Sequence, residues 1–168
     1  KGELRSPLPV GLVYDDQGCR VLDPDSEVRG AVRFLFEAFR ETGSAYAVVH
    51  KFAKEGLLFP KRAYGGAWNG KLIWGRLTES RVLGVLKNPA YAGAYVYGRH
   101  GYEKRVTEDG KIHTKTVVKP MDQWKVLIND NHVGYIDWET YLENLAILES
   151  NGAMRDGERR GAAKTGPA

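Results

Sequence analysis

The sequence predicts an α+β fold, a three-helix helix-turn-helix or winged-helix-like unit with a small antiparallel sheet and a C-terminal helix. Three observations indicate this class. Apolar residues recur at helical spacing in four segments, glycine-containing turns separate short extended segments, and capping residues precede the helical segments. The 168 residues suffice for one core, so we assign 1–150 to a single domain and 151–168 to a linker toward a downstream module.

A β-hairpin and a helix are expected first. Residues 7–22 form two extended stretches around the turn signal Asp15-Asp16-Gln17-Gly18. The helix that follows has Asp23 as its N-cap, Pro24 at its first position and Gly43 at its end. Its apolar stripe comprises Val28, Val32, Leu35, Phe36 and Phe39.

Two shorter helices come next. Ser44 caps the second, which stops at Gly56, and Thr78 caps the third. Between them, residues 60–76 combine glycine with basic and aromatic side chains, which favours an ordered loop with a brief strand or turn near Leu72–Trp74. The expected core residues are Val28, Phe36, Phe39, Phe52, Leu83 and Leu86.

The C-terminal third alternates extended and helical patterns. Asn88-Pro89 ends the third helix. Three extended segments follow, at Tyr91–Tyr97, at 99–119 with a turn at Glu108-Asp109-Gly110, and at Trp124–Ile128. A last helix begins at Asp137, and its periodic pattern dissolves after Asn151-Gly152.

Charge is distributed unevenly along the chain. The net charge is +4, but residues 51–87, the cationic block, hold eight basic and two acidic side chains, whereas both ends are acidic. Such an excess is a candidate footprint for a phosphate backbone, and a solvated face that keeps the domain soluble is the alternative. Charge alone does not separate the two.

Several kinds of chemistry lack support in the sequence. A single Cys excludes an internal disulfide framework and favours a reducing cytoplasm, and the four His show no ligand spacing, so no metal or cofactor is expected. No nucleophile or phosphate-loop motif is present. No apolar run approaches the roughly 18 residues of a membrane span. This chain is therefore expected to be non-catalytic.

Four stretches occur in the order of one family: PVGLVYDDQGCRVLDPDSEVRGAVRFLFEAF, GSAYAVVHKFAKEGLLFP, a Trp-containing loop and RVLGVLKNPAYAGAYVYG. The segment Leu86–Gly93, LKNPAYAG, is the most specific. Together they resemble the recombinase domain of large serine recombinases over roughly residues 7–150. One departure is Leu12, where the family tends to have Tyr; Tyr14 is the nearest substitute.

The resemblance implies a DNA-binding part of a strand-exchange enzyme. In that family a catalytic domain with the nucleophilic serine precedes this part, and a zinc ribbon follows it. The chain is expected to be an excised piece without either. Its expected partners are double-stranded DNA and those two domains of the parent chain, and we expect the fragment to be monomeric and not membrane-bound.

The residues suggest how such a domain would meet DNA. The second helix of a helix-turn-helix pair enters the major groove with its N-terminus toward the bases, which nominates Thr78, Ser80 and Arg81. For Arg81 a phosphate contact or an ion pair with Glu79 is the alternative. Phosphate contacts are assigned to Lys61, Arg62, Lys71, Arg76 and Lys87.

Two further groups complete the predicted interface. Tyr64, Trp68 and Asn69 are candidates for sugar or thymine contacts, although burial is favoured for Trp68 and Trp74. Arg99, His100, Lys104 and Arg105 are expected to reach a flanking groove.

The favoured function is binding of duplex DNA at an attachment site in a serine site-specific recombinase of a mobile element, for integration, excision or inversion. Two other classes stay open. One is a protein-interaction module whose basic block meets an acidic partner. The other is an RNA-binding domain that stacks single-stranded bases on its aromatic side chains.

Overall fold

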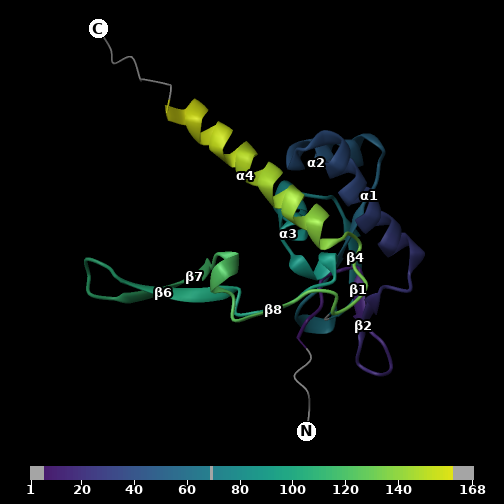
Figure 1. Ribbon diagram of the computed structural model, residues 1–168, viewed down its shortest axis with the longest axis horizontal. Coiled ribbons are helices and arrows are strands. Elements are labelled where there is room, and N and C mark those ends of the chain that lie inside the picture. The colour runs from purple at the N-terminus through teal and green to yellow at the C-terminus, as the bar shows by residue number, and fades with distance from the viewer. Residues whose placement is uncertain (1–5, 69, 161–168) are drawn as a thin grey trace.

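The computed structural model describes residues 6–68 and 70–160. Four α-helices and small antiparallel sheets confirm the α+β class with a C-terminal helix. The helices are α1 (Ser26–Thr42), α2 (Ala45–Lys54), α3 (Glu79–Leu86) and α4 (Trp138–Arg160). Figure 1 shows α1, α2 and α3 in one body, from which α4 and a long β-ribbon project separately.

All strands of the described residues form two-stranded antiparallel sheets. The pairs are β1 (Leu12–Tyr14) with β2 (Arg20–Leu22), β3 (Phe59–Arg62) with β4 (Leu72–Gly75), β5 (Tyr95–Tyr97) with β8 (Val126–Ile128), and β6 (His100–Val106) with β7 (Ile112–Val118). The predicted hairpins at residues 7–22 and 99–119 are thus confirmed.

Helix α1 begins two residues later than the sequence indicates. Its N-cap is Asp25, whose side chain accepts a hydrogen bond from the Glu27 N–H. The predicted cap, Asp23, is buried instead, and its own N–H donates to the Gly11 carbonyl of the first hairpin. The Asp23 side chain accepts from the Asp25 N–H at 2.9 Å, so Asp23 belongs to the turn that precedes the helix. Its end at Gly43, with φ 65°, is as expected.

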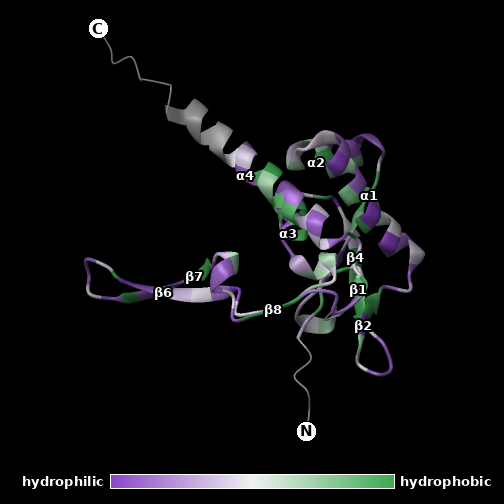
Figure 2. Cartoon of the chain, viewed as in Figure 1, coloured by the Kyte–Doolittle hydropathy of each residue, from purple (hydrophilic) through white to green (hydrophobic). Residues whose placement is uncertain are grey.

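The core lies between the three body helices. Phe52 of α2 makes edge-to-face contacts with Phe34 of α1 and with Phe59 of β3. Five of the six predicted core residues are buried, and Leu83 packs at the margin. Figure 2 shows hydrophobic and hydrophilic residues alternating along α1, as expected for an amphipathic helix.

The segment expected to be a loop is a hairpin. Strands β3 and β4 pair from Phe59↔Gly75 to Arg62↔Leu72, with a 3-10 turn at Gly66–Trp68 between them. Phe59 and Pro60 are buried against the helices, which anchors the first strand. Pro60 is compatible with a strand because both strands lie at sheet edges.

The predicted strand at Tyr91–Tyr97 is wrong in its first half. Pro89–Ala92 form a 3-10 turn capped by Asn88, whose side chain accepts from the Ala90 N–H. Gly93, with φ 73°, ends this turn. Only the last three residues then pair as β5. The expected strand at Trp124–Ile128 is likewise confined to β8.

Helix α4 starts at the predicted residue and runs further. Asp137 accepts from the Thr140 N–H at 2.7 Å. Hydrogen bonding by the Thr140 side chain, and then by its N–H, holds the pKa of this carboxyl below its usual value. The backbone stays helical to Arg160, beyond the point where the periodic pattern ends. Asn151 donates to the Gly43 carbonyl at 2.8 Å, so α4 is fastened to the end of α1. The linker assignment for 151–168 stays a prediction.

Candidate nucleic-acid interface

A small hollow lies between α3, β3 and the segment that precedes β1. Its volume is about 300 Å³. We call it the arginine notch, and its walls include Arg62, Tyr64, Ser80, Arg81, Gly84 and Tyr91. Four of these are among the predicted DNA-binding residues, although they come from two separate regions of the sequence.

Backbone carbonyls hold both arginines of the notch. Arg62 donates through Nη2 to the Leu12 carbonyl at 3.1 Å, and Arg81 donates through Nη2 to the Pro60 carbonyl at 3.1 Å. The Arg81 guanidinium also lies 6.0 Å from the ring centre of Phe59. Among the described residues no ion pair joins either guanidinium to a carboxylate, so the alternative of a Glu79–Arg81 ion pair is not supported.

Tyr91 forms the inner wall of the notch. Its side chain is 2 % exposed, and its hydroxyl donates to the Val10 carbonyl at 2.6 Å. Burial raises the pKa of this phenol, while the positive charges of Arg81 and Arg62 oppose that rise. The hydroxyl therefore stays protonated and holds the segment at Val10 in place.

Helix α3 presents one open face next to the notch. Ser80, Gly84 and Lys87 are exposed at i, i+4 and i+7, which places them along one side of the helix. Thr78 is exposed and caps the helix by accepting from the Arg81 N–H at 3.3 Å. The predicted cap is therefore confirmed, and it lies at the N-terminal end of α3.

Two other cations of the block, Lys51 and Arg76, lie away from this site. Lys51 forms an ion pair with Glu41 and lies 5.5 Å from the ring centre of Phe34. Arg76 lines a different hollow, beside Leu57 at the end of α2. Lys51 and Arg76 are therefore separate from the notch, whereas the assignment of phosphate contacts to the block stays a prediction.

Other predicted contacts of the block are exposed around the β3–β4 hairpin. They are Lys61, Tyr64, which is 69 % exposed, and Lys71. The side chain of Trp68 and all of Asn69 lie outside the described residues. Trp74 differs from the expectation of burial, since it is 36 % exposed and lines an apolar hollow of about 430 Å³ with Leu57 and Leu58.

Arg99 joins the ribbon to the body. It donates through Nη2 to the Lys87 carbonyl at 2.6 Å, and the Tyr141 hydroxyl donates to the same carbonyl at 3.1 Å. Burial lowers the pKa of the Arg99 guanidinium. This side chain thus fixes the end of α3 against α4, a structural role that the sequence pattern did not indicate. Its assigned contact with a flanking groove stays a prediction.

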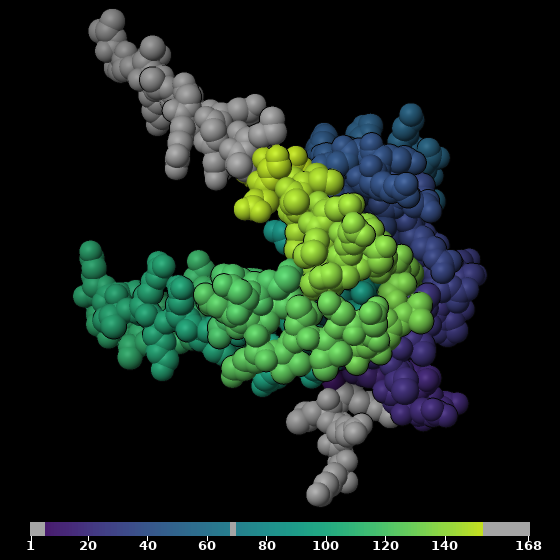
Figure 3. Space-filling view, in the orientation of Figure 1, coloured from purple at the N-terminus to yellow at the C-terminus, as the bar shows by residue number. Residues whose placement is uncertain are grey.

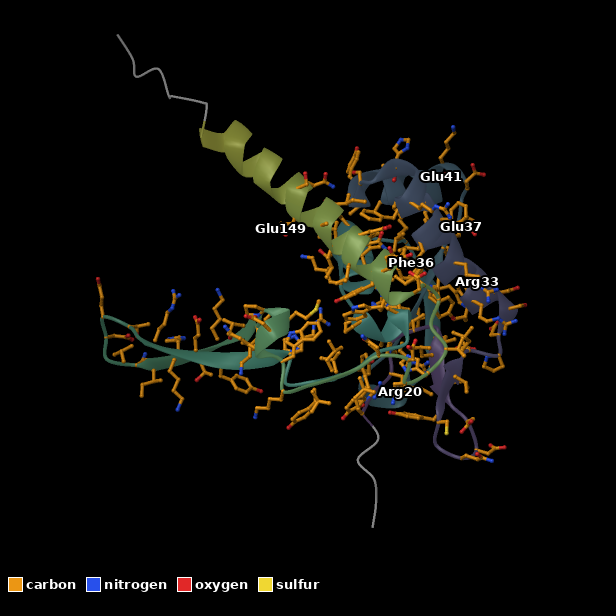
Figure 4. All side chains as sticks on the ribbon, viewed as in Figure 1. Arg20, Arg33, Phe36, Glu37, Glu41 and Glu149 are labelled. Carbon is orange, nitrogen blue, oxygen red and sulfur yellow. The ribbon has the colours of Figure 1, made fainter. Side chains whose placement is uncertain are left out.

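The β6–β7 ribbon, which we call the arm, stands clear of the body in the space-filling view (Figure 3). Its cross-strand register places Tyr102, Lys104 and Val106 on one face. Arg105 lies on the opposite face with His113 and Lys115, so the predicted residues Lys104 and Arg105 point in opposite directions. His100 is exposed at the base of the arm. Figure 4 shows side chains on both sides of the ribbon.

A hollow of about 730 Å³ between α1 and α4 was not indicated by the sequence. Arg33, Phe36 and Glu37 line it from α1 (Figure 4), and Glu143 lines it from α4. Its charges are mixed, so it favours no single ligand. Among the described residues, no group of three His, Cys, Asp or Glu side chains could hold a metal ion, and no helix is long and apolar enough to span a membrane.

The chain belongs to the Recombinase family, whose model matches residues 26–151, so the resemblance to a recombinase domain is confirmed. It is 45% identical over 151 residues to the "Uncharacterized protein y4bA/y4pH" of Sinorhizobium fredii (strain NBRC 101917 / NGR234). That match covers 90% of this chain and 21% of the relative, so the chain spans about a fifth of the relative's length.

A solved structure shares the fold. The chain matches the "Crystal Structure of a LSR-DNA Complex" with a TM-score of 0.50 at 17% sequence identity. The match covers 90% of this chain and 33% of the other. At this identity the likeness shows a common fold.

Proposed function

We propose that this chain binds duplex DNA at a recombination attachment site, as the non-catalytic part of a serine site-specific recombinase. The observation that carries the proposal is the arginine notch beside the open face of α3. Family membership supports it, and the structure that shares the fold is a complex with DNA.

Helix α3 is the element that would enter the major groove. In helix-turn-helix proteins the N-terminal residues of the second helix contact base edges. Thr78 and Ser80 occupy that position here, and both are exposed. The β3–β4 hairpin lies between α2 and α3, where a short turn joins the helices of a simple helix-turn-helix pair. It would place Lys61 and Lys71 beside the strands of the duplex.

Phosphate contacts would supply most of the affinity. Lys61, Lys71, Arg76 and Lys87 are exposed around α3 and the hairpin. Each phosphate neutralised by such a side chain releases counterions, so affinity depends on salt. The arm would extend the contact to a neighbouring groove, because a two-stranded β-ribbon fits the major groove of B-DNA.

The parent protein would supply the chemistry. A catalytic domain with a serine nucleophile and a zinc ribbon are proposed to flank this chain, which would act in the cytoplasm of a host cell during integration, excision or inversion of a mobile element. This chain and the proposed zinc ribbon of the parent protein would read the target sequence together.

A fluorescence-anisotropy titration of the 168-residue chain with a 30-bp duplex tests the proposal. The dissociation constant should rise steeply with salt, with a log–log slope of about 0.9 per phosphate contacted. A single strand of the same sequence should bind more weakly. Equal affinity for the duplex and the single strand, or an affinity that does not depend on salt, would reject duplex binding. Either result would favour one of the other two functional classes.

A further inference from the structure

The arginine notch brings two positive charges together without a compensating negative one. Arg62 and Arg81 line one hollow of about 300 Å³, and neither has a carboxylate partner among the residues described. Like charges held together away from bulk water disfavour each other. An anion that binds between the two guanidinium groups would offset the repulsion between their positive charges.

The two side chains are held in place before any ligand binds. Each uses one Nη2 group on a backbone carbonyl, Leu12 for Arg62 and Pro60 for Arg81. A guanidinium has five N–H donors, so each retains further donors. The Nε of Arg62 is buried and has no hydrogen-bond partner. The protein thus satisfies only part of the hydrogen-bonding capacity of this pair.

The notch has room for a phosphate group. Ser80 adds a hydroxyl at its rim, and Gly84 leaves its mouth open, because a Cβ at this position would meet no atom within 4 Å. A glycine in the middle of a helix costs about 1 kcal/mol relative to alanine. The missing side chain keeps space in front of the guanidinium groups.

We propose that the arginine notch binds one phosphate group of the DNA backbone. Arg81 therefore positions the chain on the duplex and does not read a base, since its guanidinium is turned back onto Pro60 and Phe59. The inference rests on the proposed function, because the DNA backbone is the source of the phosphate.

A carboxylate placed at the mouth tests the notch without removing either arginine. In Gly84→Glu the new side chain occupies the open space and competes for the guanidinium groups. Gly30→Glu is the matched control, because Gly30 is also an exposed helical glycine whose Cβ would meet no atom within 4 Å. Both variants change the net charge equally, and circular dichroism establishes that each is folded.

Gly84→Glu should bind the 30-bp duplex at least about tenfold more weakly than Gly30→Glu, as expected for loss of a charge-assisted contact. Its salt slope should fall by about 0.9, one phosphate. Arg81→Gln should lower affinity for unrelated duplexes by the same factor. Equal affinities of Gly84→Glu and Gly30→Glu for the duplex would overturn the proposal that the notch binds a DNA phosphate. The proposal that the chain binds duplex DNA would be unaffected.

A titration with inorganic phosphate shows whether the notch binds an anion when the chain does not bind DNA. If the wild-type chain does not bind the duplex at any salt concentration, the proposed function fails. Thermal protection by millimolar phosphate that is lost in Gly84→Glu but kept in Gly30→Glu would then assign the notch to free phosphate. Absence of both duplex binding and phosphate protection would overturn the notch as well.

Discussion

Two tyrosine hydroxyls fasten the segment before β1 to the body, and Tyr91→Phe tests what one of them contributes. The Tyr91 hydroxyl donates to the Val10 carbonyl at 2.6 Å, and the Tyr135 hydroxyl donates to the neighbouring Gly11 carbonyl at 2.6 Å. The Tyr91 ring contacts Phe36 edge-to-face at 5.7 Å. The phenylalanine ring preserves this packing, so the substitution isolates the hydrogen bond.

The expected cost follows from burial. Tyr91 is 2 % exposed and Val10 is 5 % exposed, so the carbonyl left behind is buried apart from the notch that both residues line. A buried polar group without its partner costs about 1–3 kcal/mol, and we expect the free energy of unfolding to fall by about 1–2 kcal/mol. For a domain of this size, that lowers Tm by about 3–6 °C.

Urea denaturation followed by circular dichroism measures this change. Tyr46→Phe is the control, because Tyr46 is 63 % exposed and its hydroxyl can exchange its partner for water. A Tyr91→Phe variant as stable as Tyr46→Phe would refute the reasoning, because it would mean that the bond to Val10 contributes nothing net. DNA affinity should be the same for both variants, since neither hydroxyl is assigned to the phosphate.

Three further outcomes are expected. The free energy of unfolding should fall as pH rises from about 10 to 12, because burial raises the pKa of Tyr135 to about 12 in the folded state. The Tyr135 hydroxyl then loses its proton at lower pH in the unfolded state, so Tyr135→Phe should show a smaller decline in alkaline urea titrations. Gly93→Ala should cost more than 2 kcal/mol on the same assay, since its Cβ would lie 2.4 Å from the His132 carbonyl oxygen at φ 73°, whereas equal stability would contradict the close approach. Arg105→Glu should weaken duplex binding more than Lys104→Glu in anisotropy titrations, because Arg105 shares its face with His113 and Lys115; the reverse order would assign the DNA-facing side of the arm to Lys104.

The arm has an exposed apolar face that the charge pattern does not indicate. Tyr102 is 76 % exposed, and Val106, Ile112 and Val118 share its face. An isolated two-stranded ribbon is marginally stable in water. A period-2 pattern in β6 and β7 could have indicated this apolar face from the sequence, because alternate residues of a strand point to the same side.

Local signals account for the parts of the fold that were predicted. The side chains of Ser44 and Thr78 accept N–H hydrogen bonds at the first turns of their helices, and Gly43 ends α1 with a positive φ. These effects depend on neighbours within four residues, so the sequence contains them in full. Asp23 is not the cap, because its side chain accepts from the Asp25 N–H and its own N–H donates to Gly11, twelve residues away.

The sequence by itself determined the helices, the caps at Ser44, Thr78 and Asp137, the two predicted hairpins and the family, since each depends on short-range spacing or on a contiguous motif. Only the tertiary structure decided which charges meet. Arg62 and Arg81 are far apart along the chain, and their anchors are carbonyls at Leu12 and Pro60. Residue spacing within a strand or helix carries no information on such pairs, because the packing of α3 against β3 brings them together.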